Sequence, residues 1–244
     1  MKWLKLKRIF LILMIIGFFS IFVLSGNLIL EDYHEYKENT KENNELIELA
    51  VEHNEISKES SINWEYLKSV NEDIIGWIEI ENTAINYPIL KDNSNLYYLK
   101  HSYNKIYNNA GSIFTTNTYP FEDFETTVYG HNMKNGTMFS MLGNYLDEEF
   151  FYSHLDIKIY TPYGNYKGKI FSAYSIGIET ESNNIKNMNF KERGEYYKKA
   201  SEYKLDNMNE VNKIIKLSTC SYINAKTSPT DQRYYIIASL EKTN

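Results

Sequence analysis

The sequence predicts a mainly β domain, either a mostly antiparallel barrel or a sandwich, with peripheral helices and an N-terminal membrane helix. Short β-like runs follow one another closely from residue 76 onward without alternating helical patterns, which argues against a parallel α/β sheet. An uncharged apolar segment near the N-terminus is long enough to cross a bilayer. The composition, 43% hydrophobic and 15% aromatic with 22 Tyr, can build a buried core and excludes a mainly disordered chain.

The N-terminal segment has the pattern of a membrane anchor. Residues 1–8, MKWLKLKR, are basic, and residues 9–30 follow without a charged side chain. About 20 apolar residues span a bilayer as a helix, and the basic flank is expected to stay in the cytoplasm. A cleaved signal peptide is the alternative, but the apolar segment is longer than a typical signal core and no small-x-small cleavage site follows it. We therefore predict a cytoplasmic segment 1–8, an uncleaved anchor 9–30 and an extracellular remainder.

A stalk is predicted between the anchor and the globular domain. Residues 31–62 are polar and charged and contain neither Gly nor Pro. Leu46, Leu49 and Ala50 fall close to helical spacing, so the stalk should be at least partly helical. The globular domain is then predicted to span residues 63–244, and to open with a short helix that Asn63 caps.

The strands are predicted from alternation and from turn residues. Within residues 76–90, Ile78 and Ile80 alternate with Glu79 and Glu81, which indicates a half-buried strand, a turn and a second strand. Further β-like runs lie at residues 111–117, 125–130, 156–164, 166–178, 211–220 and 233–241.

Two helical segments interrupt these strands. Residues 137–154 mix apolar and acidic side chains at helical spacing. Residues 189–204 begin with Asn189 as a possible N-cap and carry Glu192 three residues later, which is the pattern of a capping box. The second helix would lie in a long connection before the strand at 211–220, and connections of that length in compact domains are often functional.

Charge and motifs exclude several classes of protein. The formal net charge of −6 disfavours a nucleic-acid binder. The sequence contains neither a P-loop nor a G-x-G-x-x-G motif, and neither a Cys-pair nor an H-E-x-x-H metal pattern. We therefore predict no nucleic-acid partner, no metal and no other cofactor.

Cys220 is the only cysteine in the chain. Exported proteins tend to use cysteines in pairs, so a single one indicates a reactive thiol or an intermolecular bridge, whereas a small buried side chain is the structural alternative. In the predicted strand, Ile215, Leu217 and Thr219 share one face, and Cys220 shares the other with Lys216 and Ser218. The position of Cys220 on the polar face, at the end of the strand, favours the nucleophile.

A cysteine nucleophile needs a partner, because an unperturbed thiol is mostly protonated at neutral pH. Three histidines lie in the globular part: His101, His131 and His154. His131 comes just past a predicted strand and follows Gly130, a residue that permits unusual backbone geometry. His131 is therefore the candidate base, whereas His101 and His154 are interpreted as surface or helix-end residues.

Arg233 is a candidate for stabilising negative charge. It opens the strand that follows Cys220, and an antiparallel return would bring it back towards the thiol. Attack on a carbonyl builds charge on oxygen, and preorganised donors aimed at that oxygen lower the barrier. The alternative is an exposed charge at a strand edge.

Taken together, these segments resemble the sortases, the cysteine transpeptidases of Gram-positive cell surfaces. The resemblance rests on VYGHNMKNGTMFSML (residues 128–142), on IIKLSTCSY (residues 214–222) and on the arginine that opens the next strand. NEDIIGWIEIENTAINYPIL, followed by YYL and GSIF, is similar to the N-terminal barrel region of class B, and the anchor and the helix-bearing connection also fit that class. The resemblance covers about residues 62–240.

The resemblance implies an eight-stranded barrel with peripheral helices and assigns the site residues. It places the catalytic histidine at His131, the nucleophile at Cys220 and the catalytic arginine at Arg233. Ser218 matches a class B position near the substrate. No metal or organic cofactor is implied for the chemistry.

The resemblance also implies a reaction in two halves and its partners. Cys220 would attack the carbonyl after the Thr of a C-terminal sorting signal on a surface protein, and an amine from a peptidoglycan precursor or a pilin lysine would resolve the thioacyl enzyme. Three alternatives remain open: a hydrolytic cysteine peptidase, a pilin-polymerising sortase, and a membrane-anchored binding module that lacks activity.

Overall fold

The computed structural model describes residues 2–53, 60–93, 96–205, 211–223 and 230–243. The chain forms two compact units, Met1–Glu42 and Asn43–Asn244. The first unit holds most of helix α1 (Lys2–Ala50), whose large apolar side chains between Phe10 and Leu24 are exposed. The part from Phe10 is long and apolar enough to cross a membrane, with a mean hydropathy of 2.4 in its most apolar window. The helix continues past residue 30 without a break and ends at Ala50, so the predicted anchor and the first part of the predicted stalk lie in one helix.

The second unit begins within the last turns of α1. Leu46 and Ala50 are buried in a cluster with Leu67 and Trp77, which belong to the globular part of the chain. Strands β1 (Val51–His53) and β2 (Ser60–Ile62) follow as a separate two-stranded antiparallel sheet. Residues 54–59 of the predicted stalk lie outside the described residues, and the domain boundaries predicted from the sequence stay predictions.

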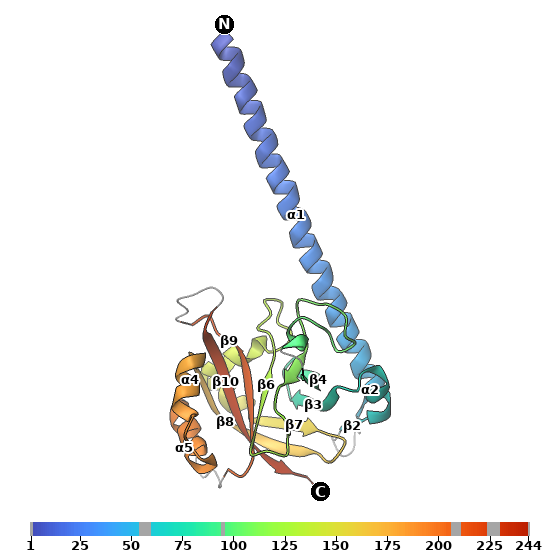
Figure 1. Ribbon diagram of the computed structural model, residues 1–244, viewed down its shortest axis with the longest axis vertical. Helices are drawn as coiled ribbons and strands as arrows, with labels where there is room; N and C mark the ends of the chain where they lie inside the picture. Colours follow the sequence, from blue (N-terminus) through green and yellow to red (C-terminus); the bar gives the residue numbers. More distant parts are fainter. Residues whose placement is uncertain (1, 54–59, 94–95, 206–210, 224–229, 244) are drawn as a thin grey trace. The chain divides into compact units, whose positions relative to one another are not determined.

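Eight strands close into a barrel, in the order β10-β8-β7-β3-β4-β5-β6-β9 (Figure 1). The strand pairs are antiparallel except β4–β5 and β6–β9, which are parallel. The predicted mostly antiparallel barrel is therefore confirmed. The strands are β3 (Ile74–Ile80), β4 (Asn86–Lys91), β5 (Ile113–Thr115), β6 (Glu125–Tyr129), β7 (Asp156–Tyr160), β8 (Tyr166–Gly177), β9 (Ile214–Cys220) and β10 (Gln232–Lys242).

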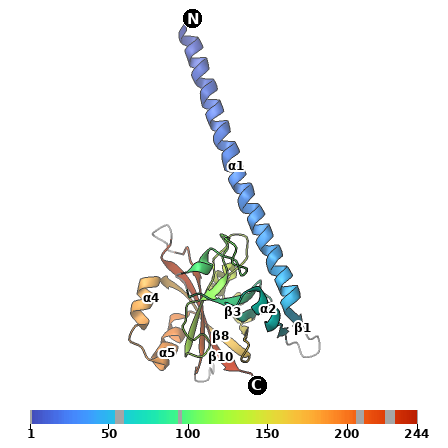
Figure 2. The ribbon, with the colours of Figure 1, turned by 45° about the vertical axis from the view of Figure 1, so that its right-hand side comes forward.

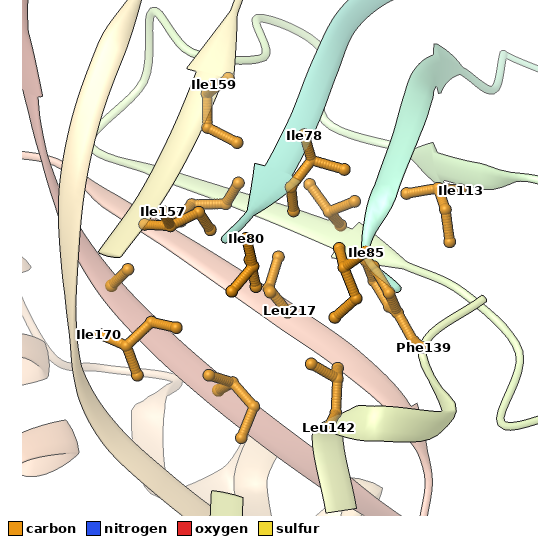
Figure 3. Close-up of a cluster of buried hydrophobic side chains, with 14 of the residues drawn as sticks. Ile78, Ile80, Ile85, Ile113, Phe139, Leu142, Ile157, Ile159, Ile170 and Leu217 are labelled. Carbon is orange, nitrogen blue, oxygen red and sulfur yellow. The ribbon is translucent and has the colours of Figure 1, made fainter. Parts of the chain in front are cut away.

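The barrel interior is filled by aliphatic side chains from alternate strand positions. Figure 3 shows Ile78 and Ile80 of β3 in one cluster with Ile157 of the neighbouring strand β7 and Leu217 of β9. All four are at most 1% exposed. Burial of an aliphatic side chain of this size contributes about 1.5–3 kcal/mol, so the alternation read in residues 76–90 is the pattern that fixes which face of β3 turns inward.

Short helices pack outside the barrel, and their ends follow local capping rules. Asn63 caps α2 (Trp64–Val70), since its side chain accepts a hydrogen bond from the Tyr66 amide at 3.0 Å. The capping box predicted for Asn189 and Glu192 is present at the start of α5 (Phe190–Ala200). Both predicted helix starts are confirmed.

The helix predicted over residues 137–154 is divided in two. A 3₁₀ segment, η2 (Ser140–Leu146), precedes α3 (Glu148–Ser153). The break falls at Asp147, whose backbone is extended and whose side chain accepts a hydrogen bond from the Phe150 amide. Asp147 therefore acts as an N-cap and starts a new helix instead of continuing the old one.

The long connection between β8 and β9 contains two helices, of which only the second was predicted. Helix α4 (Ile178–Ile185) follows β8 directly and precedes α5. Figure 2 shows both helices on the same side of the barrel. Tyr197 of α5 is buried in a further hydrophobic cluster with Tyr174 of β8, Ile214 of β9 and Tyr235 of β10, and the partly buried Ile185 of α4 packs against it.

Candidate active site

Strand β9 carries the candidate nucleophile at its C-terminal end. Ile215 and Leu217 point into the barrel core, as the alternation predicts, so Lys216, Ser218 and Cys220 occupy the outward face. Cys220 is a free thiol and is half-buried. The thiol therefore lies outside the hydrophobic interior, which disfavours a purely structural role.

Arg233 lies directly opposite Cys220 on the antiparallel neighbour β10. The Ser221 amide donates to the Gln232 carbonyl at 2.9 Å, which makes the next pair along, Cys220 and Arg233, a non-hydrogen-bonded pair. In such pairs the Cα atoms are about 4.5 Å apart and the side chains stand close on one face. Arg233 Nη1 donates to the carbonyls of Thr230 and Gln232 at 2.9 and 2.8 Å. The guanidinium is thus held by backbone carbonyls at the start of β10, on the residue that pairs in register with Cys220.

His131 is brought to the same end of β9 by its two neighbours in the chain. The Gly130 amide donates to the Ser218 carbonyl at 3.2 Å. The Asn132 side-chain amide donates to the Cys220 carbonyl at 2.8 Å. His131 stands between these two bonds, so its backbone runs beside the residues that precede and include Cys220.

The other two globular histidines have structural surroundings. The His101 ring stacks on Tyr97, with the ring centroids 3.7 Å apart. The His154 ring stacks on Phe150 at 4.0 Å and lies at the C-cap of α3. Both positions agree with the interpretation of these residues as surface and helix-end histidines.

The His131 ring is oriented by a backbone carbonyl. Its Nε2 lies 2.8 Å from the Leu99 oxygen. A carbonyl can only accept, so Nε2 carries a proton and donates it to this bond. Nδ1 is then the nitrogen through which His131 can give or take a proton.

The Leu99 carbonyl is itself held in place. Leu99 ends the 3₁₀ segment η1 (Tyr97–Leu99), whose buried Tyr98 donates its hydroxyl to Asp73 Oδ2 at 2.6 Å and accepts from Asn71 Nδ2 at 2.9 Å. Gly111 packs against η1 with φ +59°, and a Cβ there would lie 2.6 Å from the Leu99 oxygen. Glycine is required at residue 111 by both the backbone angle and the close approach.

Three parts of this arrangement were not predicted from the sequence: the Leu99 carbonyl, Gly111 and the Asn132 side chain. The interpretation of Gly130 also needs correction, because its φ is not positive. A Cβ at Gly130 would lie 2.9 Å from the Phe139 ring, so close packing and not backbone freedom requires glycine there. The sequence shows the glycine at position 130, but it does not show whether backbone conformation or close packing requires it.

Ser218 is only 3% exposed. Its backbone carbonyl is used by the Gly130 amide, and on β10 its partner in register is Tyr235. A substrate contact through the Ser218 hydroxyl would require neighbouring side chains to move, and the predicted substrate-binding role stays a prediction. Among the residues that the structure describes, no three His, Cys, Asp or Glu side chains gather where they could hold a metal ion.

Comparison with known proteins identifies the family. The family model described as Sortase domain matches residues 78–241, which include His131, Cys220 and Arg233. The chain belongs to the sortase family. Its curated relatives indicate the class: it is 38% identical to sortase B of Listeria monocytogenes over 162 residues, which is 63% of this chain and 65% of the relative, just under two thirds.

Two further relatives agree with this class. The chain is 31% identical to sortase B of Staphylococcus aureus over 190 residues, covering 74% of this chain and 75% of the relative. The solved structure of sortase B from Bacillus anthracis in complex with AAEK1 superposes with a TM-score of 0.70 at 30% identity, covering 86% of this chain and all of that one. This sortase is therefore a class B member, and the eight-stranded barrel with its helices is the fold of its solved relatives.

Proposed function

We propose that this sortase is a membrane-anchored cysteine transpeptidase, which cleaves a C-terminal sorting signal after Thr and joins the protein to an amine of a peptidoglycan precursor. The observation that carries the proposal is that the backbone brings three residues, Cys220, Arg233 and His131, to one end of β9. Cys220 lies opposite Arg233 in register, and His131 is tied to the same strand by the bonds of its neighbours.

In the first half of the reaction, Cys220 is the nucleophile. Its Sγ, as the thiolate, attacks the carbonyl carbon after the Thr, and the charge that builds on the carbonyl oxygen is stabilised by Arg233. The C–S bond forms, the C–N bond breaks, and His131 Nδ1 gives its proton to the leaving amine. The hydrogen bond from Nε2 to Leu99 keeps the ring in one orientation throughout.

In the second half, an acceptor amine attacks the thioacyl carbon. His131 Nδ1, now unprotonated, takes a proton from the attacking nitrogen, and Sγ leaves as the thiolate. One amide bond has replaced another, so the exchange needs no oxidant, reductant or nucleotide. Solved sortase B structures that hold a substrate or a triglycine peptide support both a peptide donor and an amine acceptor.

We further propose that α1 anchors the enzyme, with the basic segment 1–8 in the cytoplasm and the barrel outside the cell. The support is the apolar helix from Phe10 and the asymmetry of basic residues around it. This topology would place Cys220 where surface proteins and cell-wall precursors meet.

The proposal is tested with the full chain in detergent micelles. Quenched peptides of the LPxTG, NPxTN and SPxTG types are incubated with and without triglycine, and the products are identified by mass spectrometry. We expect a Cys220 thioacyl adduct with one peptide type and an amide product when triglycine is present. Hydrolysis that is unchanged by the amine would instead establish a peptidase, and a pilin-type lysine peptide as the better acceptor would indicate pilus assembly. Absence of labelling of Cys220 by a thiol-directed peptide inhibitor would indicate a binding module.

Gly111→Ala should lower kcat/KM by on the order of 10- to 100-fold, because a small misplacement of a catalytic group has an effect of that size. The new Cβ would displace the Leu99 carbonyl and with it the His131 ring. Steady-state kinetics with the peptide found above checks this.

Gly136→Ala is the matched control. Gly136 also has a positive φ, +87°, but a Cβ there meets nothing within 4 Å. Both variants therefore carry backbone strain, and only the first touches the carbonyl that orients His131. Equal losses of activity in the two variants would show that strain, and not the position of Leu99, is responsible.

A further inference from the structure

Glu181 of α4 and Lys216 of β9 form an almost fully buried ion pair. Lys216 Nζ lies 2.7 Å from Glu181 Oε1, and the two side chains are 5% and 3% exposed. Lys216 projects from the same outward face of β9 as Ser218 and Cys220. The pair therefore joins α4 to the strand that carries the nucleophile, on the nucleophile's own face.

Both carboxylate oxygens of Glu181 are held. The Tyr174 hydroxyl donates to Oε1 at 2.7 Å, and the Tyr196 hydroxyl donates to Oε2 at 2.8 Å. Burial, and after it the negative charge of Glu181, raises the pKa of Tyr174 far above its ordinary value. The tyrosine thus keeps its proton as the hydrogen-bond donor. One carboxylate is in this way tied to β8, to α5 and, through Lys216, to β9.

The ammonium group of Lys216 is enclosed by aromatic rings. Its Nζ lies 4.6 Å from the ring centroid of Tyr235 and 5.1 Å from that of Tyr197. Tyr235 is in turn the register partner of Ser218. The charge is therefore stabilised by ring faces and by Glu181, and the closer ring belongs to the residue that lies directly opposite the candidate substrate-binding serine.

Helix α4 begins beside the active-site arginine. The Ile178 amide, at the first residue of α4, donates to the Asp231 carbonyl at 3.0 Å. Two residues earlier, Ile176 of β8 is the register partner of Arg233. A movement of the first turn of α4 would thus displace the start of β10, where Arg233 lies.

A buried ion pair is not expected to add much to the stability of the fold. Two charges lose their hydration on burial, and replacing a buried pair by apolar side chains of similar volume is often neutral or stabilising. What a buried pair provides is a fixed position of α4 on β9, because any shift that separates the two charges leaves each buried without its partner, which is costly.

Resting on the proposed function, we propose that Glu181 and Lys216 are positioning residues for peptide binding. By fixing α4 on β9, they set the surroundings of Cys220 and Arg233 before a sorting signal arrives. Loss of the pair should raise KM for the peptide and leave the chemistry of the thiol intact.

The test compares the wild-type full chain in detergent with Glu181→Gln and with the double variant Glu181→Gln/Lys216→Met. The double variant leaves no unpaired buried charge and keeps an amide to bond the tyrosine hydroxyls, so it should fold even where the single variant does not. We measure kcat and KM for the peptide, the rate of Cys220 alkylation by iodoacetamide, and Tm. The matched control is Glu195→Gln, which removes a carboxylate from an exposed pair with Lys198 on α5.

We expect KM to rise about tenfold in the folded variants, an effect of misplacement, with alkylation within twofold of wild type and the Glu195→Gln control unchanged. A folded double variant with wild-type KM would overturn the inference. So would a parallel fall of Tm, kcat and alkylation without a selective rise in KM, which would mean a purely structural pair. Failure of the wild type to form the thioacyl adduct would instead count against the proposed function and is seen in the same experiment.

Discussion

Cys220→Ala should abolish both cleavage and transfer while the protein stays folded. Loss of the nucleophile of a covalent mechanism lowers kcat by a factor on the order of 10⁶, which is below detection for most peptide assays. Cys220 is half-buried at a strand end, outside the barrel core formed by Ile215 and Leu217, so its sulfur contributes little packing. We expect Tm to change by no more than about 2–4 °C, the shift that about 1 kcal/mol produces in a domain of this size.

The measurement is single-turnover mass spectrometry of the full chain with the peptide, alongside thermal unfolding. Cys220→Ser is the companion variant, because it keeps the shape of the side chain and replaces the thiol by a far weaker nucleophile. Transfer of peptide to triglycine by the alanine variant at any rate near wild type would refute the mechanism. A collapse of Tm would mean that Cys220 is a core residue after all, and the half-buried thiol argues against that outcome.

The barrel could be predicted from the sequence because its signals are local. Alternation of Ile78 and Ile80 with glutamates determines which face of β3 turns inward, and the same rule at Ile215 and Leu217 places Cys220 outside the core. Helix starts at Asn63 and Asn189 depend on side chains within three residues. Signals of this kind need no knowledge of what packs against the segment.

The features that escaped prediction depend on contacts between distant positions. The His131 ring is oriented by a carbonyl 32 residues earlier, and a backbone oxygen has no sequence signature. Glu181 and Lys216 are 35 residues apart, and neither is distinguishable in the sequence from an exposed charge. Helix α4 follows β8 without a side-chain cap at Gly177, so the usual start signal is missing.

The candidate site could be predicted only in part, because some of its positions follow from local sequence and others depend on contacts between distant residues. The Arg233 position follows from an antiparallel return, which a sequence argument can foresee, and the register confirms it. The approach of His131 to Cys220 depends on the parallel pairing of β6 with β9, which joins strands far apart in the chain. Its place after a predicted strand and a glycine made His131 the candidate over His101 and His154, and the family resemblance assigned the same residue.

His131→Ala should lower kcat/KM by about 10²–10⁴-fold, the usual contribution of a general acid–base group. Both halves of the reaction transfer a proton through Nδ1, but they do not depend equally on that transfer. Protonation of the leaving amine is essential with an amide substrate and far less so with an ester whose alcohol leaves readily as the anion. The structure therefore predicts that a peptide ester of the same sequence restores acylation of Cys220 in the variant and leaves the amine step slow.

The measurement is rapid-quench mass spectrometry of the full chain with the peptide and with its ester, in the presence and absence of triglycine. A thioacyl enzyme that accumulates from the ester and resolves slowly is the expected signature. His154→Ala, which removes a histidine stacked on Phe150 at the end of α3, should behave as wild type. Acylation by the ordinary peptide at wild-type rate in His131→Ala would exclude the histidine as the acid. If acylation were slow with the ester as well, His131 would act chiefly by forming the thiolate, since that step precedes any leaving group.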